Sequence, residues 1–150
     1  MRTQKISYGK ENDLNLKAFI GISRTTQALH KRAGNIFSKG GLTSAQFAVL
    51  EALYHKGDLT INEIMESILS TSGNMTVVIN NLEKEALIER KPNPKDKRSC
   101  IIMITATGRQ KIEEIFPMHV KDLAESFAGL EEEEKELLVR LLRKIRTRSD

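Results

Sequence analysis

A cluster of positive charge between residues 90 and 98 is the clearest chemical feature of the sequence. The segment RKPNPKDKR contains five cations in nine residues, and Asp96 is its only acid. Guanidinium and ammonium groups at this density can bind the phosphates of a nucleic-acid backbone. Because two prolines cannot sit inside a strand ladder, we expect a stiff loop at 92–98 in which Asp96 pairs with Arg98. The cations are Arg90, Lys91, Lys95, Lys97 and Arg98.

A second polar set lies just before this cluster, at helical spacing. Met75, Val78, Ile79 and Leu82 keep the spacing of a buried stripe, so the intervening residues must face solvent. Amide side chains can bond adenine bidentately, and the methyl groups of Thr or Val can contact thymine. The N–H groups at the start of such a helix can also hold a phosphate. The DNA contacts expected here are Ser70, Thr71, Ser72, Asn74, Thr76, Val77, Asn80, Asn81 and Lys84.

The elements that position these residues form a recognisable order. Capping boxes at 43–46 and 60–63 each begin a helix, and the second helix is followed by a turn and a further helix to about residue 85. The period then changes to two short strands, 87–91 and 100–104. The sequence thus predicts a mainly α fold with a small β-hairpin wing: a winged helix-turn-helix, with the helix-turn-helix at about 60–86 and the wing at 87–104.

Long helices are expected on both sides of this unit. One spans about 12–38, a second follows Thr105 and should be kinked or divided by Pro117, and the last spans about 131–146. They have more apolar surface than a small winged unit can cover, which predicts a homodimer. The expected division is an arm and dimerisation helix (1–38), the winged domain (39–106) and C-terminal dimerisation helices (107–150).

The bulk properties restrict the remaining classes of function. The chain has 150 residues, a net charge of +4, one cysteine and three histidines. It has no apolar run of membrane-spanning length and no signal peptide, so we expect a cytoplasmic protein that does not engage a membrane. The histidines lack metal-ligand spacing, and neither a nucleophile elbow nor a phosphate-binding glycine loop is present. The sequence therefore predicts no metal, no cofactor and no enzyme activity.

Residues 96–108, DKRSCIIMITATG, resemble the wing-to-helix signature of the MarR (multiple antibiotic resistance regulator) family. Residues 82–90, 41–43 and 47–50 also resemble the family, and the similarity extends from about residue 12 to 146. It implies a homodimeric transcriptional regulator, a repressor in our interpretation, that reads a pseudo-palindromic operator and inserts Arg98 into the minor groove. Many relatives have Thr-Arg where this chain has Thr76-Val77, which shifts the expected base contacts towards Ser72, Asn74, Thr76 and Asn80.

The resemblance also implies regulation by a small phenolic or anionic effector. Seven residues could line a cleft for this effector, or could simply pack in the core. They are Phe19, Ile22, Thr26, His30, Phe47, Leu50 and Tyr54. Two alternatives remain open: a redox-responsive regulator acting through Cys100, and a winged-helix protein-interaction module that does not bind DNA. Only DNA binding should weaken steeply as salt rises.

Overall fold

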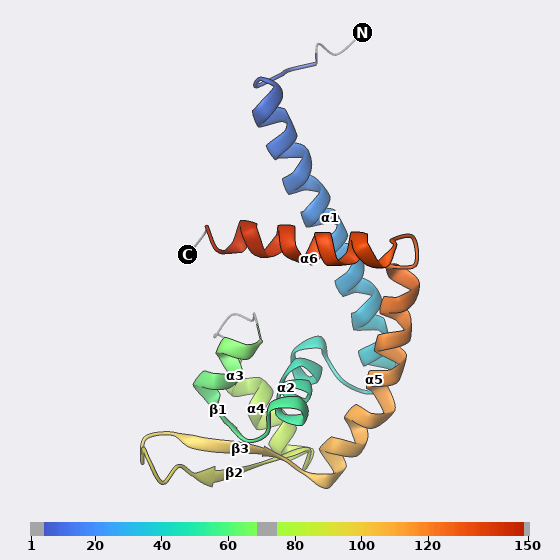
Figure 1. Ribbon diagram of the computed structural model, residues 1–150. Helices are drawn as coiled ribbons and strands as arrows, with labels where there is room; N and C mark the ends of the chain where they lie inside the picture. Colours follow the sequence, from blue (N-terminus) through green and yellow to red (C-terminus); the bar gives the residue numbers. More distant parts are fainter. Residues whose placement is uncertain (1–4, 69–74, 149–150) are drawn as a thin grey trace.

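The computed structural model describes residues 5–68 and 75–148, and within them it contains six helices and a three-stranded antiparallel sheet (Figure 1). This confirms the expected mainly helical fold with a small β-hairpin. In chain order the elements are α1 (Lys10–Lys39), α2 (Ser44–Lys56), β1 (Leu59–Thr60), α3 (Ile61–Ser67), α4 (Met75–Lys84), β2 (Ile88–Pro92), β3 (Cys100–Ile104), α5 (Ala106–Ser126) and α6 (Glu132–Arg146).

Both predicted capping boxes are formed. At the start of α2, the Thr43 hydroxyl accepts from the backbone N–H of Gln46 at 3.1 Å, and the Gln46 side chain accepts from the backbone N–H of Thr43 at 3.0 Å. Thr60 and Glu63 make the same reciprocal pair at the start of α3, at 3.2 and 2.9 Å. Each box satisfies two N–H groups that have no partner within the helix, so local sequence fixes where α2 and α3 begin.

The sheet differs from the predicted hairpin in two ways. Its strand order is β1-β3-β2, and β1 pairs Leu59 with Ile102; this two-residue strand is too short to show an alternating pattern. Pro92 was expected in the loop, but it is the last residue of β2 and lies opposite Cys100. Because β2 is an edge strand, a residue without an N–H is tolerated at its end.

The core lies between α2, α3, α4, the sheet and the first half of α5. Side chains from each of these elements are almost completely removed from solvent, and apolar burial of this kind is the main stabilising contribution to the fold. The most buried ones are Val49, Leu50, Leu53, Ile64, Met75, Ile79, Leu82, Ile88, Ile102, Ile112 and Ile115.

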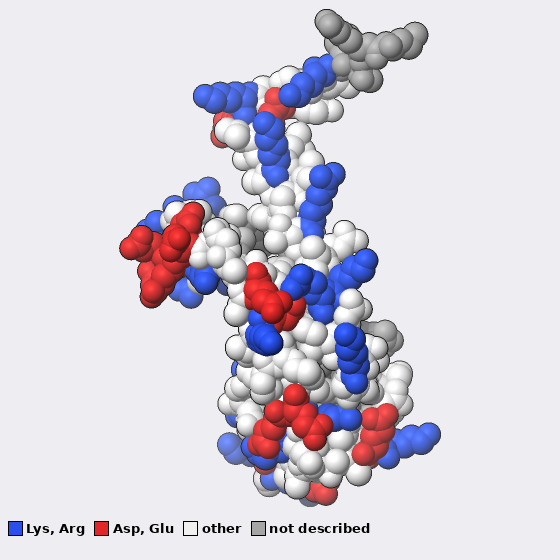
Figure 2. All heavy atoms as spheres, turned by 90° about the vertical axis from the view of Figure 1, so that its right-hand side faces the viewer, with Lys and Arg blue, Asp and Glu red and all other residues white. Residues whose placement is uncertain are grey.

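The two terminal helices stand largely outside this core. Figure 1 shows the first half of α1 projecting away from the sheet, and its Leu14 and Phe19 are 56% and 70% exposed. Lys and Arg side chains follow the projecting part in Figure 2; on α1, Lys10, Lys17, Arg24 and Lys31 recur every seven residues. α6 has no buried residue at all.

Pro117 does not divide α5, contrary to one of the two outcomes expected from the sequence. The helix is continuous across it, and Figure 1 shows α5 changing direction along its length, as a missing backbone N–H allows. None of the described helices has the length and apolar character needed to cross a membrane.

Candidate nucleic-acid interface

The outer face of α4 is exposed and has no acid before Glu83. Thr76, Val77, Asn80, Asn81 and Lys84 all point away from the core, while the stripe on the other side of the helix is buried. Val77 is 55% exposed, so its methyl groups are accessible to a ligand. The helix therefore presents short polar and methyl-bearing groups, which suit the major groove of DNA.

Four of the expected contacts cannot be placed on this surface. Ser70, Thr71, Ser72 and Asn74 lie outside the described residues. The described part of the interface therefore consists of α4 and the wing.

The tip of the wing is shaped by hydrogen bonds of the Asn93 side chain. Asn93 Oδ1 accepts from the N–H of Lys95 at 3.0 Å, and Asn93 Nδ2 donates to Ser99 Oγ at 2.9 Å. The N–H of Asp96 donates to the carbonyl of Asn93 at 3.3 Å, which closes a turn around Pro94. Asn before Pro is a favourable beginning for such a turn. Asn93 was not among the predicted site residues, although an Asn-Pro pair is typical of a turn and could have indicated its role.

Asp96 and Arg98 interact differently from the predicted ion pair. Asp96 Oδ1 accepts a 2.9 Å hydrogen bond from the backbone N–H of Arg98, and no ion pair joins the two side chains. The short Asp side chain reaches the N–H two residues ahead more readily than a distant guanidinium. The carboxylate thus orders the tip without neutralising Arg98.

The five cations of the wing fall into two groups. Arg90 lies against Glu83 at 3.2 Å, and Lys91 lies against Asp58 at 3.3 Å. Contact of these two residues with DNA stays a prediction, and in this structure acids from α4 and from the segment before β1 pair with them. Lys95, Lys97 and Arg98 are exposed and form no ion pair with any residue that the structure describes, so the free positive charge is concentrated at the tip.

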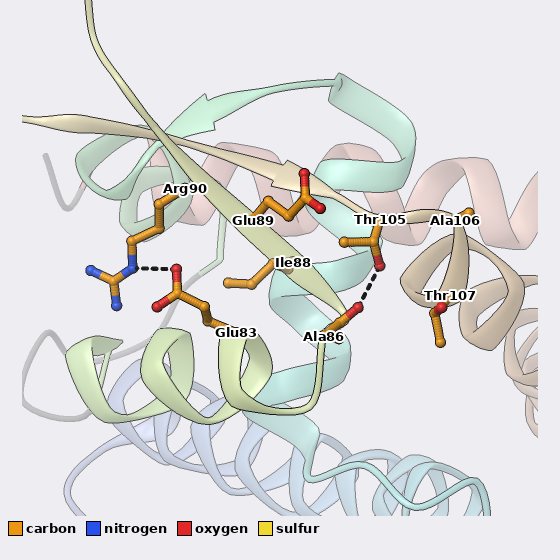
Figure 3. Close-up of a pocket in the computed structure, with 8 residues that line it drawn as sticks. All are labelled: Glu83, Ala86, Ile88, Glu89, Arg90, Thr105, Ala106 and Thr107. Atoms are coloured by element: carbon orange, nitrogen blue, oxygen red, sulfur yellow. Dashed lines mark hydrogen bonds and ion pairs between the residues drawn. The ribbon is translucent and has the colours of Figure 1, made fainter.

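A shallow hollow marks the joint between α4, β2 and α5 (Figure 3). The Thr105 hydroxyl donates to the Ala86 carbonyl at 2.7 Å and accepts from the N–H of Gly108 at 3.0 Å. Ala86 has a φ of 59°, a strained value for a residue with a Cβ. Together these contacts fix the direction in which the wing leaves α4. The hollow is lined by Glu83, Ala86, Ile88, Glu89, Arg90, Thr105, Ala106 and Thr107.

The predicted effector cleft is not formed within one chain. Phe19 and Ile22 are 70% and 41% exposed on the projecting part of α1. Thr26 and His30 are exposed as well, whereas Phe47 and Leu50 are buried and Tyr54 is half-buried. The direction of α1 separates the two groups, and helical periodicity contains no information about that direction. For Phe47, the alternative of plain core packing holds, since its ring stacks on Phe37 at 3.8 Å.

An aromatic cluster surrounds His119, a residue that the sequence analysis did not single out. The imidazole lies edge-on to Phe37 at 5.1 Å and to Phe47 at 5.7 Å between ring centres. Burial lowers the pKa of His119, although Asp122 and Glu51 act in the opposite direction. Its Nδ1 is buried and has no hydrogen-bond partner among the described residues. Burial of the ring thus disfavours the protonated form of the imidazole.

Cys100 is half-buried at the first position of β3, opposite Pro92. Across residues 5–68 and 75–148, no three His, Cys, Asp or Glu side chains are grouped so that they could hold a metal ion.

Comparison with known proteins agrees with this arrangement. The model of the MarR family matches residues 42–100. The chain is 37% identical over 131 residues to the HTH-type transcriptional regulator MhqR of Bacillus subtilis, covering 87% of this chain and 90% of the relative. It also shares its fold with a mutant of Escherichia coli MarR complexed with operator DNA, at a TM-score of 0.79, 25% identity and coverage of 91% and 99%.

A further solved structure concerns regulation by a small molecule. It is Bordetella bronchiseptica BpsR, whose DNA binding is regulated by 6-hydroxynicotinic acid; it is 27% identical, with a TM-score of 0.70 and coverage of 84% of this chain and 98% of that one. The relatives and the fold are those of regulators and not of enzymes. This chain belongs to the MarR family and is a winged helix-turn-helix transcriptional regulator.

Proposed function

We propose that the protein is a cytoplasmic repressor that binds a pseudo-palindromic operator in double-stranded DNA through α4 and the wing. One observation carries the proposal: the outer face of α4, which has no acid before Glu83, belongs to the same unit as a wing tip whose three cations form no ion pair with any described residue. The helix face provides base contacts, mainly from Thr76, Val77 and Asn80. Lys95, Lys97 and Arg98 bind the backbone, and Arg98 enters the minor groove.

The operator is bound by a homodimer whose contacts come from 1–38 and 107–150. The apolar side chains exposed on α1 and α6 support this assignment, because a monomer would leave them in water. Twofold symmetry then places two copies of α4 about 34 Å apart, one turn of DNA. The winged domain, 39–106, is the part that reads the operator. The apolar side chains concerned are Leu14, Leu16, Phe19, Ile20, Ile22, Leu137, Val139, Leu141 and Ile145.

A small phenolic or anionic effector releases the operator. The regulation of BpsR by 6-hydroxynicotinic acid supports the chemical class of the effector. Because the residues first expected to line the cleft are split between the projecting α1 and the core, a site containing them needs the partner subunit. The relatives give no support to a redox switch at Cys100 or to a winged module without DNA.

The test is a salt series of DNA binding measured by fluorescence anisotropy. Selection from random duplexes supplies the operator, and a shuffled duplex serves as control. We expect affinity for both duplexes to fall by about 10³-fold or more between 50 and 200 mM salt, because each phosphate contact releases a counterion. A protein whose binding to duplex DNA is absent, or insensitive to salt, is not the regulator proposed here.

A further inference from the structure

Arg90 connects the wing to the outer face of α4. Its Nη2 donates to Oδ1 of Asn80, and its Nε lies 3.2 Å from Oε2 of Glu83. Asn80 and Glu83 are three residues apart, so they occupy neighbouring positions on the same side of α4. Figure 3 shows the Arg90 side chain extending from β2 towards Glu83 on α4.

This contact determines which atom of the Asn80 amide faces the wing. A guanidinium has only donors, so it must meet the carbonyl oxygen of the amide and not its nitrogen. The amide is planar, and its Nδ2 group therefore points to the opposite side of Cγ from Arg90. That group forms no hydrogen bond with any other residue in the described part of the chain, and Asn80 is exposed. Asn80 thus offers two N–H donors to a ligand.

We propose that Arg90 is a positioning residue that makes Asn80 a reader of guanine in place of adenine. A free Asn pairs with adenine by accepting from N6 and donating to N7. With one lone pair of this oxygen taken by the Arg90 guanidinium, Asn80 can accept from adenine N6 only through the remaining lone pair, on an oxygen already engaged by a cation, so N6 would exchange a good bond to water for a poorer one. Guanine presents two acceptors, O6 and N7, to the Nδ2 group. This inference rests on the proposed function, since it requires α4 to lie in the major groove.

The positive charge of Arg90 has a different role from its hydrogen bond to Asn80. Glu83 neutralises it within the protein, so Arg90 does not release a counterion from DNA as an unpaired wing cation does. Replacement of Arg90 should therefore alter base preference with little effect on the salt dependence. A residue that served only as a phosphate contact would behave in the opposite way.

The experiment is selection of bound duplexes from a random pool, with wild type, Asn80→Ala and Arg90→Met. Asn80→Ala identifies the base pair that Asn80 reads, as the position where preference is lost. There we expect wild type to favour guanine over adenine by about tenfold or more. Arg90→Met keeps the aliphatic stem and removes every donor, so adenine should gain until the ratio is within about threefold. Replacing that guanine with 7-deazaguanine, which lacks the N7 acceptor, should weaken wild-type binding by about tenfold.

Lys91→Met is the matched control, because Lys91 is the next residue of β2 and is also paired, but with Asp58. It should leave the base preference unchanged. The inference is overturned if wild type favours adenine at this position, if Asn80→Ala alters no position, or if Arg90→Met retains the guanine preference. The wild-type preference and the 7-deazaguanine measurement decide the matter even if Arg90→Met does not fold. A pool in which no duplex is bound overturns the proposed function itself.

Discussion

The carboxylate of Asp96 accepts a hydrogen bond from the backbone N–H of Arg98, at 2.9 Å, and leaves the Arg98 guanidinium free. In the wing, Asp96 therefore has a structural role that its charge does not reveal. The arrangement separates two functions within three residues, because one side chain orders the tip while the other remains available to a phosphate or a groove.

Replacing Arg98 with Ala should weaken binding to the operator and to random DNA alike. Arg98 has no acid partner among the described residues, so its removal eliminates one counterion released on binding, and the slope of log K against log salt should decrease in magnitude by about one. Fluorescence anisotropy at several salt concentrations measures both quantities. Lys91→Ala, which removes a cation already paired with Asp58 at 3.3 Å, should change the slope much less. Equal slopes for wild type and Arg98→Ala would contradict the role of the wing tip.

Replacing Asp96 with Ala should also weaken DNA binding, although it removes a negative charge from a surface that faces phosphate. Charge alone predicts tighter binding. The lost bond to the Arg98 N–H loosens the tip, however, and a bond of this kind contributes about 0.5–1.5 kcal/mol. We expect affinity to fall by about this amount, as measured by anisotropy. Glu89→Ala, which removes an exposed acid from β2, is the control and should bind equally or slightly more tightly. Tighter binding by Asp96→Ala would show that charge outweighs shape at the tip.

The features that the sequence predicted correctly depend on local chemistry. The starts of α2 and α3 follow from Thr43 with Gln46 and from Thr60 with Glu63, pairs that lie three residues apart. The buried stripe of α4 follows from helical periodicity in the same way. Such features require no knowledge of the tertiary structure, so a single sequence suffices to predict them.

The features that the sequence could not predict concern contacts between elements. Arg90 and Lys91 look like free cations until α4 and the segment before β1 are placed beside β2. Phe19 and Phe47 look like neighbours until the direction of α1 is known. Pro92 could be placed in β2 only after β2 was known to be an edge strand. Each of these depends on distances between residues that the spacing of apolar positions does not encode.

Replacing Phe19 with Asp should shift the protein from dimer to monomer. The side chain is 70% exposed in one chain, so in a monomer the change would cost little. In a twofold interface it removes two buried aromatic rings, each contributing about 1.5–3 kcal/mol, and the dimer dissociation constant should rise about a hundredfold or more. Sedimentation equilibrium measures the constant. Lys17→Ser, on the charged side of α1, is the control. Identical sedimentation of wild type and Phe19→Asp would remove α1 from the dimer interface.

Stability should fall in mild acid because of His119. Burial lowers its pKa from the ordinary value of 6.5, so below pH 6.5 the unfolded chain takes up a proton that the folded chain does not. The free energy of unfolding therefore decreases as pH falls from 6.5 towards the lowered pKa, and this contribution is constant below it. Urea unfolding at several pH values should show a weaker dependence for His119→Phe, which keeps the ring packing, than for wild type. His30→Gln, an exposed control on α1, should behave like wild type.

Replacing Gly108 with Ala should destabilise the protein, although alanine favours helices over glycine by about 1 kcal/mol. Gly108 lies in the first turn of α5, where a Cβ would be 2.2 Å from the carbonyl oxygen of Leu87. Backbone cannot move aside as a flexible side chain can, so we expect a net loss of about 1–3 kcal/mol from overpacking. Gly21→Ala in α1, where an added Cβ meets nothing within 4 Å, is the matched control and should be neutral or stabilising. Chemical denaturation of both variants measures the two changes, and only Gly108→Ala should lower the free energy of unfolding. Equal stability of Gly108→Ala and Gly21→Ala would contradict the close packing of α5 against the turn between α4 and β2. It would also contradict the role of that packing in fixing the direction of the wing.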